Sequence, residues 1–241
     1  MCVDLAVDIL VVQEPWLVPS QGNYSNTRSI NHPSFAQIFP TLLDPSLRPR
    51  VLLYASNNFQ AQINPLASFP SDPDCQAVTI SSTTFTLNLF NVYNEDDQQG
   101  LLERTIERSL LSKQLPSDCL VLGDFNTHDL WWDPLSLSTS PGAAAFIDWI
   151  ENQGLELLNT PGVGTFFRLN MSRESVLDLS FTSRSLARRI QDWQVIPGLG
   201  SDHHGLLFAI KTSNTQESAP PPNSSRFNIN LAKWDIFRST L

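Results

Sequence analysis

The chain has 241 residues, of which 41% are hydrophobic and 16% charged, and its formal net charge is −9. This length and composition suit a globular protein with a sizeable core and exclude an intrinsically disordered one. The sequence holds no apolar run of the roughly 20 residues that span a bilayer. Its start, MCVDLAVD, lacks the cationic segment of a secretory signal. We therefore expect an intracellular protein without membrane contact.

The cysteine content and the net charge indicate the cellular compartment and the kind of partner. Three scattered cysteines match neither a metal-ligand spacing nor an even-numbered disulfide framework, which indicates a reducing compartment. The acidic excess argues against strong non-specific binding to DNA phosphates. Charges are screened over roughly 8–10 Å at physiological salt, so a local basic rim remains compatible with the acidic total. Arginines that could form such a rim are Arg168, Arg173, Arg184, Arg188 and Arg189.

The first half of the chain predicts short strands separated by polar turns. An apolar strand is expected at residues 7–12, and the carboxylate of Glu14 follows its end. Residues 19–31 are polar and read as a surface loop. Tyr93 ends the longest of the next strands, which are expected at residues 35–39, 51–55, 77–81 and 85–93.

Two helices are expected in the second half. Leu102, Ile106 and Leu110 recur every four residues and predict a helix at 98–115, with Asp96 or Asp97 as its N-cap. A second helix is expected at 141–153. Its limits are set by Ser140 as N-cap and Gly154 as the stop.

The remaining strands complete the predicted fold class. They are expected at residues 119–122, 155–158, 175–181, 193–196 and 206–210. Strands outnumber helices, and the helices fall between strands, which indicates a layered α/β fold with mixed sheets. The domain is expected to cover residues 1–211, followed by a Pro/Ser-rich linker at 212–225 and a short helix at 226–241.

Polar side chains follow the buried strand at 119–122. Asp124 and Asn126 come directly after it, with Phe125 between them, so both are expected on one side of the chain. Open α/β sheets place their ligands at this end of a strand. The alternative is an ordinary loop start, because Gly, Asp and Asn are common turn residues.

A second pair of residues suggests catalytic chemistry. Asp178 stands inside the apolar run SVLDLSF, where an unpaired carboxylate would be costly. Its expected partner is His203 in the sequence SDHH, because an Asp that fixes the tautomer of an imidazole is a recurring catalytic device. Taken alone, the tripeptide SDH is also compatible with a simple strand cap.

In this order, Glu14, Tyr93, GDFN, Asp178 and SDH resemble the endonuclease/exonuclease/phosphatase family. More narrowly, the chain resembles the endonuclease domain of fungal non-LTR retrotransposon reverse transcriptases. The motifs are VVQEPW, RVLLYAS, NVYN, GDFNTHDLWW, LELLNTPGVGTF, SVLDLSF and GSDHH. The resemblance implies a DNase I-like four-layer α/β sandwich, in which two mixed β-sheets pack face to face with helices outside.

The resemblance also implies a metal site. Glu14 would bind a divalent ion, Mg²⁺ or alternatively Mn²⁺, since hard cations prefer carboxylate and phosphate oxygens. Asp202 would complete this site. Asp124 would orient or deprotonate the attacking water, and Asn126 would bond the phosphate or fix Asp124. The metal would offset charge that develops in the transition state.

The other implied roles concern the phosphate. His203, held by Asp178, would stabilise charge on the phosphoryl oxygen, and Tyr93 would touch the same phosphate. Thr165 would be a further phosphate contact. His128 and His204 lie beside the motifs and are expected to be bystanders.

The sequence departs from the family at its start. The family's first strand, which carries an active-site asparagine, is missing, and we expect a domain truncated at the N-terminus. The tail RFNINLAKWDIF resembles the connector toward a reverse transcriptase domain in a parent polyprotein.

Three functions follow as hypotheses. The first is a Mg²⁺-dependent endonuclease that nicks DNA and leaves a 3′-hydroxyl, nuclear if it acts on chromosomal DNA. The second is a phosphoesterase for a small phosphorylated substrate, which the net acidic charge favours. The third is an inactive truncated remnant, which the missing strand favours.

Overall fold

The computed structural model describes residues 5–18, 23–69, 72–95 and 103–212. The predicted N-cap at Asp96 or Asp97, nearly all of the predicted linker and the predicted helix at 226–241 lie outside these residues. In the described part of the chain, no helix has the length and apolar composition needed to cross a bilayer.

A six-stranded mixed sheet forms the centre of the molecule, with strand order β4-β5-β6-β7-β9-β8. The pair β6 and β7 is parallel, and the other neighbouring pairs are antiparallel. The strands are β4 (Gln62–Pro65), β5 (Cys75–Ser81), β6 (Thr86–Tyr93), β7 (Cys119–Asp124), β8 (Leu155–Leu157) and β9 (Asp178–Ser183). Strand β4 was not predicted.

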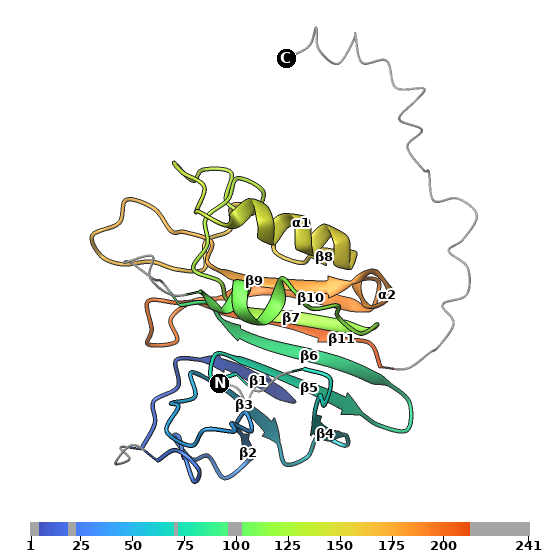
Figure 1. The fold of residues 1–241 in the computed structure, drawn as a ribbon. Helices are drawn as coiled ribbons and strands as arrows, with labels where there is room; N and C mark the ends of the chain where they lie inside the picture. Colours follow the sequence, from blue (N-terminus) through green and yellow to red (C-terminus); the bar gives the residue numbers. More distant parts are fainter. Residues whose placement is uncertain (1–4, 19–22, 70–71, 96–102, 213–241) are drawn as a thin grey trace, which may run out of the picture.

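Two smaller sheets pack against one face of this central sheet (Figure 1). One has the order β1-β3-β2, and the other is the pair β10-β11. A shared apolar cluster joins them to the central sheet through Leu53, Leu87, Leu120 and Phe208. The two packed layers of strands confirm the predicted face-to-face sandwich. The strands are β1 (Ile9–Gln13), β2 (Phe35–Ile38), β3 (Val51–Ser56), β10 (Ile190–Ile196) and β11 (Gly205–Ile210).

Helix α1 (Ala143–Gln153) covers the opposite face of the central sheet (Figure 1). Its predicted apolar face is confirmed, because Phe146, Trp149 and Ile150 belong to the core cluster that contains Phe181. Gly154 ends the helix as predicted, with φ of 66°. No helix of the described residues lies over the far face of the β1-β3-β2 sheet, where the four-layer arrangement has its second helical layer.

Two helix predictions need correction. Helix α1 begins after Gly142, two residues later than predicted, and Ser140 is not its N-cap because the Ser140 hydroxyl accepts the N–H of His128. Of the predicted helix at 98–115, the described part contains only a π-helical turn, η1 (Ile106–Leu110). Arg108 and Ser109 of this turn bond to Asp72 in the segment before β5. The short helix α2 (Arg184–Ala187) was not predicted.

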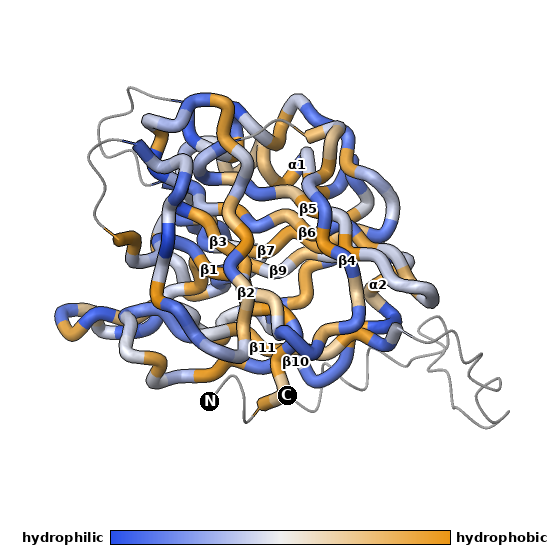
Figure 2. Tube along the Cα trace, turned by 90° about the horizontal axis from the view of Figure 1, so that it is seen from below, coloured by the Kyte–Doolittle hydropathy of each residue, from blue (hydrophilic) through white to orange (hydrophobic). Residues whose placement is uncertain are grey.

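Strand β1 and strand β11 each pair on one side only within the described residues. β1 pairs with β3, and β11 pairs with β10. From below, the β1-β3-β2 group and the β10-β11 pair form separate groups (Figure 2). The predicted loss of a strand ahead of β1 stays a prediction.

Gly123 is required by the close approach of β6 to β7. Its φ is 155°, and a Cβ at this position would lie 1.8 Å from the carbonyl oxygen of Val92. We therefore expect Gly123→Ala to lower the free energy of unfolding by about 3 kcal/mol, as measured by urea denaturation. Gly154 is the matched control, since its φ is 66° and a Cβ there meets nothing within 4 Å. Gly154→Ala should cost only about 1 kcal/mol, and equal losses would contradict this account.

Candidate functional site

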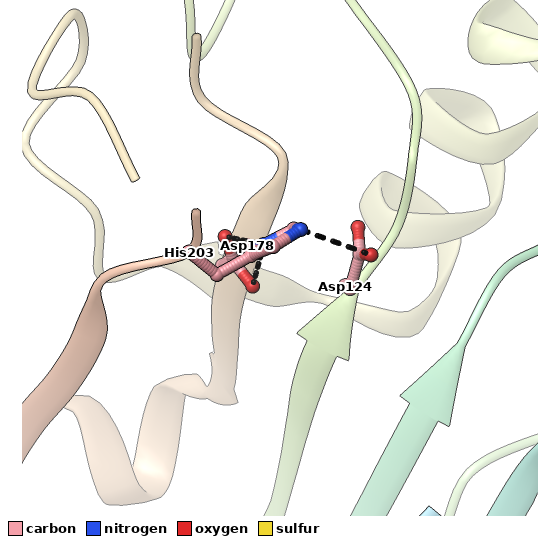
Figure 3. Close-up of side chains that lie close together, drawn as sticks. All are labelled: Asp124, Asp178 and His203. Carbon is pink, nitrogen blue, oxygen red and sulfur yellow. Dashed lines mark hydrogen bonds and ion pairs between the residues drawn. The ribbon is translucent and has the colours of Figure 1, made fainter. Parts of the chain in front are cut away.

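Three titratable side chains meet at one end of the central sheet (Figure 3). Asp124 is the last residue of β7, and its partner in the β7–β9 register is Asp178, the first residue of β9. His203 comes from the segment that leads into β11. Nδ1 of His203 lies 2.9 Å from Oδ2 of Asp178, and its Nε2 lies 3.9 Å from Oδ2 of Asp124. One ligand atom from each residue lies within 4.8 Å of the others.

The backbone around His203 is held by an isolated β-bridge. Phe166 pairs in this way both with Ser175 and with His203. The Phe166 ring lies 4.7 Å from the imidazole, centroid to centroid. The N–H of His203 also donates to the hydroxyl of Ser201 at 3.1 Å. These contacts fix the imidazole between the two carboxylates.

Asp124 is almost fully buried, with 5% of its surface exposed. Burial and the charge of Asp178 raise the pKa of Asp124 to about 7, although the charge of His203 opposes this shift. Asn126 donates to the carboxylate twice at 3.0 Å, from its backbone N–H and from Nδ2. Asn126 has φ of 43°, a left-handed conformation that asparagine tolerates better than most residues. Asp124 and Asn126 thus lie together as predicted.

The pKa of His203 is raised above its ordinary value. Burial alone would lower it, but the hydrogen bond and charge of Asp178 outweigh burial, and the charges of Asp124 and Asp202 act in the same direction. A raised pKa increases the fraction of His203 that is protonated at any given pH.

Glu14 and Tyr93 face the same site. Tyr93 is paired with Asp124 in the parallel β6–β7 register. Burial, followed by the charge of Glu14 and then that of Asp124, raises the pKa of its phenol. Glu14 also contributes to the raised pKa of Asp124. The structure therefore brings six of the predicted site residues into one neighbourhood, namely Glu14, Tyr93, Asp124, Asn126, Asp178 and His203.

Asp202 and Thr165 take different positions. The exposed Asp202 forms an ion pair with Arg168 at 3.0 Å and lies outside the group of Asp124, Asp178 and His203. Thr165 is fully buried, and its hydroxyl accepts the N–H groups of Leu177 and Asp178, each at 3.0 Å. This bond holds the backbone that carries Asp178. The metal role of Asp202 and the phosphate contact of Thr165 stay predictions.

The two histidines expected to be bystanders lie outside the three-residue group. Nε2 of His204 lies 3.3 Å from Glu174. The backbone N–H of His128 donates to Ser140 at 2.8 Å.

Two asparagines that received no role from the sequence support the site from beneath. Asn94 donates from Nδ2 to the carbonyl of Phe125 and from its N–H to the carbonyl of Asp124, both at 2.8 Å. Asn159 donates to the carbonyl of Asp178 at 2.9 Å. Both stand in the motifs NVYN and LELLNTPGVGTF, but an uncharged amide offers no signal of its own.

Comparison with known families agrees with this geometry. A family model described as "Endonuclease-reverse transcriptase" matches residues 87–207, half of the chain. The chain belongs to the endonuclease/exonuclease/phosphatase family. The recognition made from the motifs is confirmed, and membership assigns the chain to the hydrolytic nucleases. No curated protein matches the sequence.

Solved structures share the fold. The endonuclease domain of TRAS1, a telomere-specific non-LTR retrotransposon, is 20% identical with a TM-score of 0.66, and 88% of each chain is covered. The AP endonuclease LMAP from Leishmania major is 14% identical with a TM-score of 0.64, covering 87% of this chain and 80% of that one. The 3′ phosphatase NExo from Neisseria, bound to a product DNA hairpin, is 14% identical with a TM-score of 0.53, covering 85% and 89%.

The donor set of the site fits a divalent cation. The carboxylates of Asp124 and Asp178 lie beside each other with one imidazole, and like charges this close are costly unless a cation or a proton offsets them. Carboxylate oxygens are the ligands that Mg²⁺ and Mn²⁺ prefer.

Replacing Asp178 tests the electrostatic coupling to His203. In Asp178→Asn, the imidazole loses its hydrogen-bonded carboxylate, so the pKa of His203 should fall below the wild-type value. An NMR titration of the histidine ring protons measures this shift, and the exposed His32 serves as an internal control. An unchanged pKa of His203 would contradict the coupling.

Replacing Asp124 tests how much its buried, ionised carboxylate lowers the free energy of unfolding. The pKa of Asp124 rises from 3.8 to about 7 on folding, so the folded protein binds this proton more tightly than the unfolded chain. The stability that the proton provides is lost as the pH rises through about 7. Without divalent cations, Asp124→Asn should be more stable than wild type at pH 8, by up to about 4 kcal/mol, with little difference at pH 4. Asp148→Asn, at an exposed position of α1, is the control. A difference that stays constant with pH would refute the assignment.

Proposed function

We propose that the chain is a Mg²⁺-dependent DNA endonuclease that nicks one strand and leaves a 3′-hydroxyl. The observation that carries the proposal is the group of Asp124, Asp178 and His203 at the end of the central sheet. The match to a family described as endonuclease-reverse transcriptase supports a role in retrotransposition beside a reverse transcriptase domain. Such a role places the protein in the nucleus when chromosomal DNA is cut.

Each residue of the site has a separate role in the proposed hydrolysis. Asp124, with a pKa of about 7, accepts a proton from the attacking water as the water oxygen bonds to phosphorus. The P–O3′ bond breaks, and O3′ takes up a proton from solvent. His203 directs Nε2 toward the site and stabilises negative charge on the phosphoryl oxygens, while Asp178 holds Nδ1. Asn126 keeps the Asp124 carboxylate oriented.

The cation supplies charge neutralisation at the phosphate. Glu14 and Asp202 are proposed to hold it, beside the carboxylates of Asp124 and Asp178. We propose Mg²⁺, with Mn²⁺ as the alternative, because both ions prefer carboxylate and phosphate oxygens. Tyr93 is proposed as a phosphate contact, and the buried Thr165 as a support for the backbone that carries Asp178.

DNA is favoured as the substrate by two observations. A solved relative with this fold is a 3′ phosphatase bound to a product DNA hairpin. Arg168 lies at the rim of the site with 64% of its side chain exposed, next to Asp202. Its guanidinium is paired with Asp202 at 3.0 Å and would be free to bond a DNA phosphate when Asp202 turns to the cation, although the net charge of the chain is −9. The acidic total favours the second candidate, hydrolysis of a small phosphorylated substrate.

A plasmid assay tests the proposal. Wild-type protein with Mg²⁺ should convert supercoiled DNA to the nicked circle, and the product should prime a DNA polymerase because it carries a 3′-hydroxyl. Asp124→Ala and His203→Ala should each lower the rate at least about 100-fold, as expected when a general base or a charge stabiliser is removed. His32→Ala, at an exposed position, should leave the rate unchanged.

The other outcomes identify the competing functions. Hydrolysis of phosphomonoesters without DNA cleavage would favour the small-substrate enzyme. Folded protein that cleaves neither substrate with Mg²⁺ or Mn²⁺, and that behaves like Asp124→Ala, would favour the inactive remnant.

A further inference from the structure

A second cluster of charged side chains lies beside the site and has no part in the proposed chemistry. We call it the Arg50 network. Its members are Arg50, Asp72, Asp74, Glu95 and Arg108. They come from the residue before β3, the segment just before β5, the segment after β6, and η1.

The two arginines bind the three carboxylates with good geometry. Arg50 donates from Nε and an Nη to the two oxygens of Asp74, each at 2.5 Å, and also to Glu95. Arg108 donates to Asp72 at 2.9 and 3.2 Å, to Glu95 at 2.9 Å, and to Asp74. The side chain of Asp74 is 1% exposed. A buried carboxylate of this kind is costly unless it is paired. Replacing a buried ion pair with apolar residues often leaves a fold equally stable, so stability alone does not explain the network.

Arg50 and Asp74 contact the Glu14–Tyr93 pair at three points. The backbone carbonyl of Arg50 accepts the N–H of Glu14 at 2.8 Å. The Cζ of Arg50 lies 5.1 Å from the centroid of the Tyr93 ring. The backbone carbonyl of Asp74 accepts the N–H of Tyr93 at 2.8 Å.

Glu14 needs this support because of its backbone conformation. Its φ is 49°, a left-handed value that costs a non-glycine residue energy unless its surroundings fix it. The bond from its N–H to Arg50 lies at the turn where the chain leaves β1. The charge of its carboxylate acts on Tyr93, where it helps to raise the pKa of the phenol.

We propose that Arg50 is a positioning residue for Glu14 and Tyr93. Its carbonyl fixes the backbone of Glu14, its guanidinium supports the ring of Tyr93, and Asp74 and Glu95 hold the guanidinium in place. The inference rests on the proposed nuclease function for its effect on catalysis. Arginine suits this place because its planar group binds a carboxylate with its edge and an aromatic ring with its face, which a lysine ammonium cannot do.

The expected catalytic effect is large although Arg50 touches no reacting atom. A displacement of about 1 Å in a positioned group lowers rates by about 100-fold. In Arg50→Met, the maximal nicking rate should therefore fall about 30- to 100-fold. If Glu14 binds the cation, the Mg²⁺ concentration for half-maximal rate should rise severalfold, which a general loss of stability would not produce. Arg50→Lys should recover only part of the rate.

Arg48→Met is the matched control. It is the same substitution at an exposed arginine in the segment before β3. Its nicking rate and Mg²⁺ dependence should equal those of wild type.

A second measurement tests the position of Tyr93 without any activity. Tetranitromethane nitrates exposed tyrosines, and mass spectrometry of the peptides reports each one. Tyr93 is 8% exposed and should resist nitration in wild type, with Tyr24 and Tyr54 as more exposed internal references. Arg50→Met should raise nitration of Tyr93 severalfold, while nitration of Tyr24 and Tyr54 stays unchanged.

Glu95→Gln guards against an unfolded Arg50 variant, because it removes one partner of the guanidinium and keeps the arginine. It should produce a smaller change in the same direction. Unchanged nitration of Tyr93 and an unchanged rate in a folded Arg50→Met protein would overturn the inference. Wild-type protein that fails to nick DNA would overturn the proposed function instead, and the nitration result would still decide the placement of Tyr93.

Discussion

The pairing of Asp124 with Asp178 across β7 and β9 is the constraint on which the site depends. The register places two carboxylates opposite each other at the end of a buried sheet, where their like charges repel. The structure offsets this repulsion with two groups, the imidazole of His203 from a distant segment and the amide of Asn126, two residues after Asp124. The proposed chemistry uses both of these groups. The contacts that reduce the repulsion between Asp124 and Asp178 therefore also assemble the site.

The rest of the fold follows from bringing further groups to that pair. The parallel step from β6 to β7 puts Tyr93 beside Asp124, and it does so at a distance that only glycine allows at position 123. β1 belongs to the other layer, so Glu14 reaches the site across the sandwich. Asn91 in β6 joins the two layers, since its side chain bonds to Gln13 and to the carbonyls of Val12 and Leu52. A residue of the central sheet thereby fixes the strand that delivers Glu14.

Residue spacing along the sequence was sufficient to predict the features that depend only on neighbouring residues. The apolar face of α1, the stop at Gly154 and most strands follow from spacing and turn chemistry. The pairing of Asp178 with His203 was also foreseeable, because a carboxylate inside an apolar strand needs a partner and a motif histidine was available.

The parts that escaped prediction depend on contacts between distant segments. Arg50 and Arg108 look like ordinary surface arginines until β3, β5 and η1 bring three acidic residues around them. Spacing alone predicted a long helix where the described residues form a π-helical turn, since no local pattern records that Asp72 binds Ser109 and Arg108. The buried position of Thr165 was equally hidden, because a motif threonine can bond a phosphate or a backbone.

The one-sided pairing of β1 has a consequence for how copies of the protein meet. The strand reads ILVVQ, an apolar sequence with high β propensity, and one of its edges carries no strand among the described residues. Asp8 and Glu14, both exposed, bracket it. Charges that flank such a strand act as gatekeepers, because stacking a second copy on the edge would bring like charges together. Glu14 would then serve solubility as well as the site, and replacing it would cost the protein a safeguard against self-association.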